Sequence, residues 1–198
     1  MLSRKHLSKG ALAVILSSML VVNGCWVKSQ WIQTAINDLP TLIQIITSLI
    51  SIAGAAQGKG QVDPAMAAQI QTVGVQVQSD LQLLQNLVNT YQAADAAAKP
   101  GLLNKIDTGL ATVQTNLTGL LAAFHVNNTA LQATITASLS LAMTTILAIQ
   151  SLVPPPPAAT AARRAISASP VKPMSSHDLK AAFNGVVNSN GYGQFAIN

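Results

Sequence analysis

The sequence predicts an all-α protein: an antiparallel four-helix bundle over residues 28–153, followed by a Pro-rich, largely irregular C-terminal extension. Apolar residues recur at steps of three and four through residues 28–153, the spacing that places them on one face of a helix. Breaks rich in Gly, Pro and Asn divide this run into four segments. The connections between the later segments are short, which favours antiparallel neighbours.

The first 24 residues have the pattern of an export signal. Arg4, Lys5 and Lys9 form a positive region without an acid, and an uncharged apolar run follows over residues 11–22. A small residue, Gly24, precedes the single cysteine of the chain. A basic segment, an apolar segment of this length and a small residue before the cut are the three parts of a secretory signal.

The stretch Val22-Asn23-Gly24-Cys25 resembles the lipobox of bacterial lipoproteins, although the family prefers Leu and a small residue where Val22 and Asn23 stand. The resemblance implies that the Cys25 thiol is alkylated with diacylglycerol. It further implies cleavage between Gly24 and Cys25 and acylation of the new amine, so that residues 25–27 form a lipidated N-terminus. The body of the chain resembles small helical-bundle lipoproteins.

Lipid on Cys25 would give the protein a membrane partner, because two or three acyl chains hold a protein to a bilayer where one does not. In the lipoprotein family an Asp directly after the Cys retains the protein in the inner membrane. This chain has Trp26 there, which implies the outer membrane in a cell with two membranes. An uncleaved membrane anchor and ordinary signal cleavage are the alternatives.

The composition argues against a nucleic-acid partner. The formal charge of +5 falls to +2 when the three cations of the signal are removed, and aromatic residues make up only 4 % of the chain. Base-stacking surfaces are therefore not expected. The chain contains no Glu, and residues 108–162 carry no charge. With one cysteine and no internal disulfide, the fold must be stabilised by packing.

The first predicted helix covers about residues 28–55 and contains Pro40, which we expect to kink or split it. The second begins at Asp63, an N-cap residue, with Pro64 at the first helical position. Its apolar stripe runs from Ile70 to Tyr91 at steps of three and four.

The third predicted helix begins near Pro100 and ends at Phe124. Asn127 or Asn128 is expected to cap the fourth, which ends at Val153 before four prolines. The octapeptides VQSDLQLL (residues 77–84) and VQTNLTGL (residues 113–120) are similar. They are interpreted as two amphipathic helices with a common period, in preference to a solenoid repeat.

Residues 154–198 are predicted to be a Pro-rich linker and a flexible tail. A short helix is expected within this tail. Ser175 and Asp178 resemble a capping box, and Leu179, Phe183 and Val186 would form its apolar face. The Gly- and Asn-rich end of the chain is expected to be loose.

No constellation of catalytic residues is found, so the chain is not predicted to be an enzyme and no cofactor is expected. The Asp residues fall mostly at predicted caps, loops or exposed helix positions. Only His125 and His177 remain after signal cleavage, which is too few for a metal site. Trp31 is expected either at the headgroup level of a membrane, together with Trp26, or in the core.

The sequence therefore favours a lipid-anchored helical bundle of the cell envelope with a structural, scaffolding or interaction role. Its partner would be another envelope protein or the cell wall. The alternatives are a carrier of a lipid or apolar small molecule in the bundle core, and a membrane-perturbing helical hairpin formed by the third and fourth helices.

Overall fold

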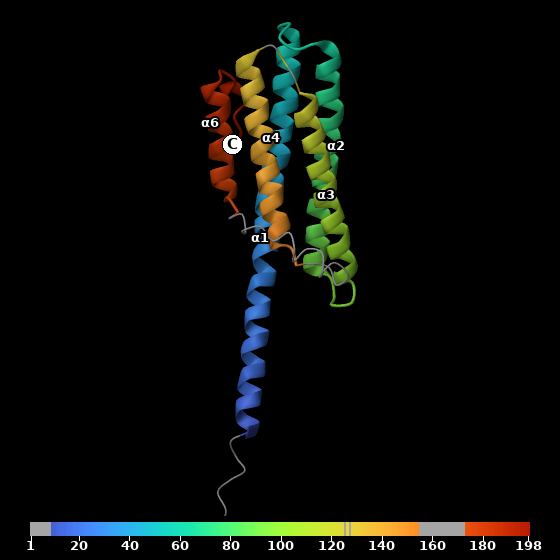
Figure 1. Cartoon of the computed structure of the whole chain (residues 1–198), viewed down its shortest axis with the longest axis vertical. Coiled ribbons are helices and arrows are strands. Elements are labelled where there is room, and N and C mark those ends of the chain that lie inside the picture. The colour runs from blue at the N-terminus through green and yellow to red at the C-terminus, as the bar shows by residue number, and fades with distance from the viewer. Residues whose placement is uncertain (1–8, 125, 127, 155–172) are drawn as a thin grey trace, which may run out of the picture.

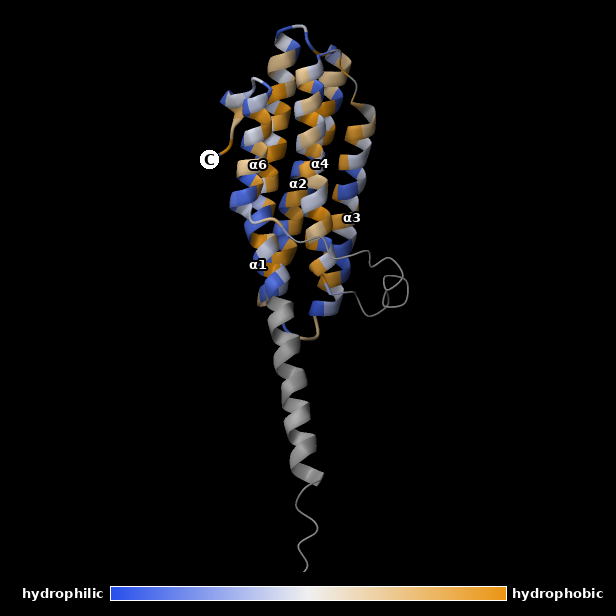
Figure 2. Ribbon diagram, turned by 60° about the vertical axis from the view of Figure 1, so that its left-hand side comes forward, coloured by the Kyte–Doolittle hydropathy of each residue, from blue (hydrophilic) through white to orange (hydrophobic). Residues whose placement is uncertain are grey.

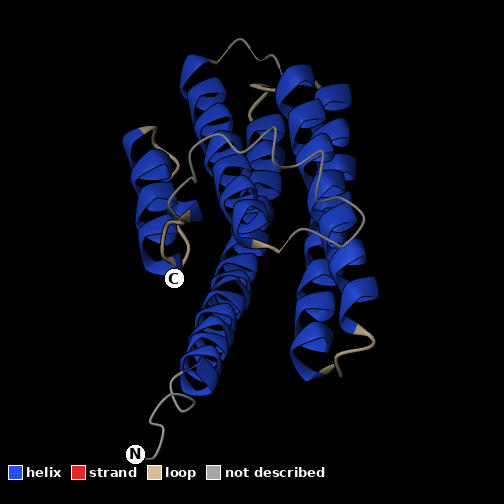
Figure 3. Ribbon diagram, turned by 60° about the horizontal axis from the view of Figure 1, so that its bottom comes forward, coloured by secondary structure: helices blue, strands red, loops and turns tan. Residues whose placement is uncertain are grey.

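The computed structural model is all-helical, as the sequence predicts. It describes residues 9–124, 126, 128–154 and 173–198, with side chains described from residue 30 onward except at residue 123. Within these ranges there are five α-helices and one 3-10 turn, and no strand (Figure 3). They are α1 (Lys9–Gly58), α2 (Pro64–Ala93), α3 (Lys99–Ala123), α4 (Thr129–Leu152), α6 (Ser176–Ser189) and η1 (Gly193–Phe195).

The first four helices enclose a common core. α1 contacts α2 and α4, and α3 contacts the same two helices, so each of the four has two neighbours in the set (Figure 1). Each contributes side chains that are at most 1 % exposed, among them Leu81, Leu117 and Ile146. Figure 2 shows hydrophobic residues along each of these helices, and most of their large apolar side chains are buried. These residues belong to the stripes that the sequence periodicity predicts.

The helix α1 continues through Pro40, so of the two effects predicted for this residue, a kink or a split, the split does not occur. Proline removes one backbone hydrogen bond and crowds the preceding turn. The packing on both sides of Pro40 offsets this cost, because Leu39 and Leu42 are each 1 % exposed. Helix α1 also begins well before the predicted start at residue 28.

The predicted helix starts are confirmed by their caps. The Asp63 carboxylate accepts a hydrogen bond from the Ala65 backbone N–H at 2.8 Å, and Pro64 occupies the first position of α2. The Asn128 side-chain oxygen accepts from the Leu131 N–H at 2.9 Å at the start of α4. Both caps satisfy backbone donors that have no partner within their own helix.

The C-terminal end is packed against the bundle, which corrects the prediction of a loose tail. Leu179, Phe183 and Val187 of α6 are 0 % exposed, and α6 contacts both α1 and α4. Val187, rather than the predicted Val186, completes the apolar face. The last residues fold back as well, since the Ile197 N–H donates to the Asn184 side-chain oxygen at 2.8 Å. The Pro-rich linker prediction falls mostly on residues 155–172, outside the described ranges.

The predicted cap of α6 is present. The Ser175 hydroxyl oxygen accepts from the Asp178 N–H at 3.1 Å, and the same hydroxyl donates to the Asp178 carboxylate at 2.7 Å. This hydrogen bond, followed by the one from His177, holds the pKa of Asp178 below its ordinary value.

We expect Ser175→Ala to lower the free energy of unfolding by about 1 kcal/mol, the usual cost of losing an N-cap side chain. Urea denaturation of the variant measures this. Ser176→Ala, one position further on, is the matched control and should change the stability by much less. Equal effects of the two substitutions would contradict the capping role.

The threonine side chains on the helix surfaces turn back onto their own backbone. The hydroxyls of Thr72, Thr90 and Thr118 each donate to the carbonyl four residues earlier, at 2.8–2.9 Å. The polar end of such a side chain is then satisfied within its own helix. The surface of the bundle therefore offers fewer free hydroxyl donors to solvent than its Thr content suggests.

Candidate functional site

The predicted lipidation and cleavage residues, Gly24 and Cys25, lie within the range of α1 but outside the residues whose side chains are described. His125 also lies outside the described residues. Trp31 is described and is 0 % exposed, so of its two expected positions the structure shows the core. Its ring contacts Tyr91 of α2 at a centroid distance of 5.1 Å.

The described residues contain no group of three His, Cys, Asp or Glu side chains that could hold a metal ion. One acid departs from the predicted exposed positions. Asp38 is 2 % exposed, and its Oδ2 has no hydrogen-bond partner within the described part of the chain. Sequence periodicity missed it because a single polar residue hardly changes an apolar stripe.

Burial raises the pKa of Asp38 to about 6. No cation is available on the same stretch, because Asp38 is the only charged residue between Gln30 and Gly58, and α4 carries no charge at all. A carboxylate that loses water without gaining a partner favours its neutral form. Asp38 is thus a buried acid that changes its charge near neutral pH.

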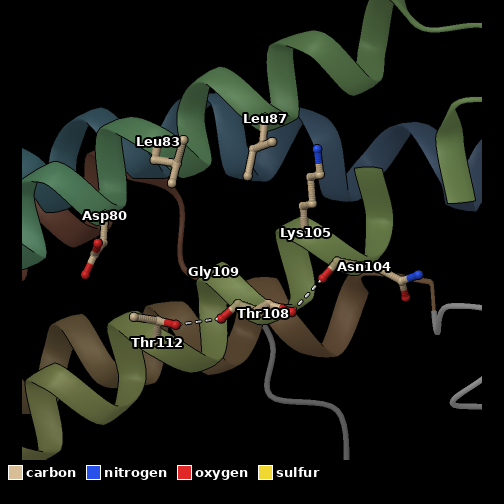
Figure 4. A pocket seen from close by; sticks show the side chains of 8 residues that line it. All are labelled: Asp80, Leu83, Leu87, Asn104, Lys105, Thr108, Gly109 and Thr112. Atoms are coloured by element: carbon tan, nitrogen blue, oxygen red, sulfur yellow. Dashed lines mark hydrogen bonds between the residues drawn. The ribbon is translucent and has the colours of Figure 1, made fainter. Parts of the chain in front are cut away.

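A hollow lies between α2 and α3 (Figure 4). Its volume is about 520 Å³. The side chains that line it come from two turns of each helix or more. They are Asp80, Leu83 and Leu87 of α2, and Asn104, Lys105, Thr108, Gly109 and Thr112 of α3. We call this surface the α2/α3 groove.

The two helices are held in register on either side of this groove by specific contacts. The Asn116 amide of α3 donates to Asp80 Oδ2 of α2 at 2.9 Å. Within α2 the Gln76 amide donates to Asp80 Oδ1 at 2.9 Å, which orients the carboxylate. At Gly109 the helices approach so closely that a Cβ atom would lie 2.7 Å from Leu84 Cδ2. Asp80 and Asn116 occupy the same position in the two similar octapeptides, which meet at this hydrogen bond.

Lys105 is the cation of the groove. It is exposed, and no carboxylate forms an ion pair with its ammonium group in the part of the chain that the structure describes. It also lines a second hollow of about 640 Å³ between the end of α2 and the start of α3. An unpaired ammonium group between two hollows is free to meet an anionic group from another molecule.

Leu83 supplies the apolar part of the groove and is 57 % exposed. In Figure 4 it points, with Leu87, toward the α3 side of the groove. The sequence stripe of this helix includes Leu81 and Leu84 but not Leu83. A leucine outside the stripe was the one signal by which sequence reasoning could have found this surface, because a large apolar residue off the core face has no partner within its own fold.

Two helical stretches are long and apolar enough to cross a membrane by length and composition: Gln30–Gly58 of α1 and Thr129–Leu152, the whole of α4. Half of the apolar window of the first and 44 % of that of the second are buried inside the fold. Both therefore contribute one face to the core described above. The predicted membrane-active hairpin would need α3 as well, and α3 does not meet the criterion.

Comparison of the chain with models of protein families, with curated proteins and with solved structures found no match.

Proposed function

We propose that this protein is a lipid-anchored component of the bacterial cell envelope that acts through protein contacts and not through catalysis. The lipid is attached to Cys25, and the outer membrane is its location in a cell with two membranes. In this proposal α1 to α4 form an antiparallel four-helix bundle that projects from the membrane, and α6 covers one side of it. The contacts of each of these four helices with two neighbours support that arrangement.

The α2/α3 groove is the observation that carries the interaction role. It places a 57 % exposed leucine beside a lysine without an ion-pair partner among the described residues, on a surface that otherwise has few charges. Protein interfaces are depleted in charge at their centre and contain apolar anchors there. The N-terminal pattern from Arg4 to Cys25 supports the anchor independently of this groove.

We expect Cys25→Ala to prevent both the lipidation and the cleavage that the lipobox resemblance implies. The variant should then keep residues 1–24, with their apolar run, and carry no diacylglycerol. The mass of the chain extracted from membranes measures the change, with Ser29→Ala as a control that leaves the lipidation motif intact. Mass spectrometry of the N-terminal peptide from membranes should show a chain that starts at Cys25 and carries diacylglycerol. An unmodified Cys25 or an intact residue 1–24 segment would contradict the anchor.

A further inference from the structure

We infer that the α2/α3 groove is the contact surface of a homodimer, in which two copies pair face to face about a two-fold axis that lies across the helices. This dimer gives the groove a partner, which is a second copy of this chain. It rests on the proposed function in one respect, that the groove binds a protein. The lipid anchor can be absent without affecting it. The order of the groove side chains along the helices determines this pairing.

The hydrogen bond between Asn116 and Asp80 fixes this order. The contact of Gly109 with Leu84 lies earlier on α3 and later on α2, so residue numbers rise in opposite directions along the two helices. Lys105 lies eleven residues before Asn116, which is about 16 Å along the axis at about 1.5 Å per residue. Leu83 and Leu87 follow Asp80 by three and seven residues, about 4 and 10 Å by the same rise.

An acid therefore lies at one end of the groove, a base at the other, and two leucines between them at nearly symmetric distances. A two-fold axis across the helices, midway between the leucines, reverses this order in the second copy. Asp80 of each copy then lies at the level of Lys105 of the other, and the leucines of the two copies interdigitate. Such a surface is self-complementary, and because the contact is isologous it closes as a dimer.

The shape of the groove agrees with this pairing. Leu83 projects from the surface, since it is 57 % exposed. Gly109 has no side chain and lines the hollow near the level of Leu87. In the proposed dimer the Leu83 side chain of one copy enters the hollow over Gly109 and Leu87 of the other. A large apolar side chain in a partner's pocket is the usual centre of a stable interface.

The chemistry of the surrounding surface favours the same partner. Asp80 is the only charged residue in the 30 residues of α2. The Thr108 hydroxyl donates to the Asn104 carbonyl at 2.9 Å and the Thr112 hydroxyl to the Thr108 carbonyl at 3.0 Å (Figure 4). These hydroxyls have their hydrogen-bond donors satisfied, so that covering them leaves no donor unpaired.

The face reaches the lower limit of a specific interface. The two-fold axis crosses α2 near residue 85, eight residues before the helix ends at Ala93, so that about 24 Å of α2 faces its copy at about 1.5 Å per residue. The axis crosses α3 near residue 111, twelve residues from each end of that helix, so that about 36 Å of α3 faces its copy. A face of about 30 Å by about 20 Å covers about 600 Å², and specific interfaces begin at about 600 Å² on each partner.

The test is sedimentation of the full chain in maltoside micelles over a concentration series, together with two kinds of variant. Leu83→Gln removes the projecting side chain and should weaken dimerisation at least about tenfold. Leu147→Gln on α4 is the matched control, because Leu147 is also exposed, at 38 %, but lies outside the groove. Circular dichroism establishes that each variant is folded.

Charge exchange provides the second kind of variant. Lys105→Asp alone should weaken the dimer by placing two acids together, and the same chain with Asp80→Lys added should regain most of the affinity. Carbodiimide treatment of a mixture of isotopically labelled and unlabelled wild-type chains should yield an intermolecular Asp80–Lys105 cross-link.

The inference is overturned if the full chain sediments as a monomer at every concentration, or if Leu83→Gln dimerises as tightly as Leu147→Gln. A monomer that retains a fatty acid in native mass spectrometry would identify the groove as a carrier site for an anionic amphiphile instead. Failure of dimerisation with lipid present on Cys25 would leave the anchor intact, so the two proposals fail separately.

Discussion

Phe183→Ala is expected to lower the free energy of unfolding by about 3–5 kcal/mol, the usual cost of removing a fully buried phenylalanine side chain. The Phe183 side chain is 0 % exposed and belongs to the same apolar cluster as the side chains of α1 and α4. The cavity left behind would border three helices. Urea denaturation measures the change, and limited proteolysis should show earlier cleavage within residues 173–198.

Phe195→Ala is the matched control for this substitution. Phe195 lies in η1 and is partly buried, so that its truncation removes less apolar contact and should cost clearly less. If the C-terminal end were as loose as its Gly- and Asn-rich sequence suggests, both substitutions would be nearly neutral. Such a result would show that α6 does not contribute to the cooperative core.

The stability of the protein is expected to fall as the pH rises from 4 to 7, by at most about 3 kcal/mol through Asp38. Burial raises the pKa of this group from 3.8 to about 6 in the folded state. Below pH 3.8 the carboxyl is protonated in both the folded and the unfolded chain, and its contribution to stability is fully present. As the pH rises through 6 the folded state must hold a buried carboxylate, and the contribution is lost.

Asp38→Asn should remove this dependence, because the amide has nearly the same shape and no charge at any of these pH values. The variant should be more stable than the wild type at pH 7, and its urea midpoint should change little between pH 4 and 7. Asp95→Asn is the control and should keep the wild-type slope, because Asp95 is exposed. A wild-type stability that rises over this pH range would contradict the role of Asp38.

Much of the fold could be predicted because helices carry their signals locally. The caps at Asp63, Asn128 and Ser175 are where the sequence places them. The apolar stripe of α2 is buried from Ile70 to Tyr91 as the period of three and four requires. These features depend on residues a few positions apart, and such patterns are readable without knowledge of the partner helix.

The features that the sequence did not predict have a common cause, since each depends on which helices pack against one another. Pro40 predicts a kink or a split of the helix, and the split does not occur because packing on both sides of it keeps α1 continuous. The composition of residues 173–198 is typical of a loose end. Three side chains of α6 are nevertheless buried, and α6 packs against α1 and α4. The α2/α3 groove depends on Lys105 and Leu83 coming together across two helices. Periodicity identifies a buried face but does not say what covers it.

If Cys25 carries the proposed lipid, the burial of Trp31 would limit how far the folded domain can move from it. Trp31 is 0 % exposed and follows Cys25 by six residues. The segment between them is at most about 20 Å long, even when fully extended. Copies held so close to one bilayer would search for each other in two dimensions and not three. Confinement of this kind raises the effective concentration of neighbours without any new contact. A weak self-association measured in solution would then be strengthened by the membrane itself, and density of copies in the bilayer would set the fraction paired.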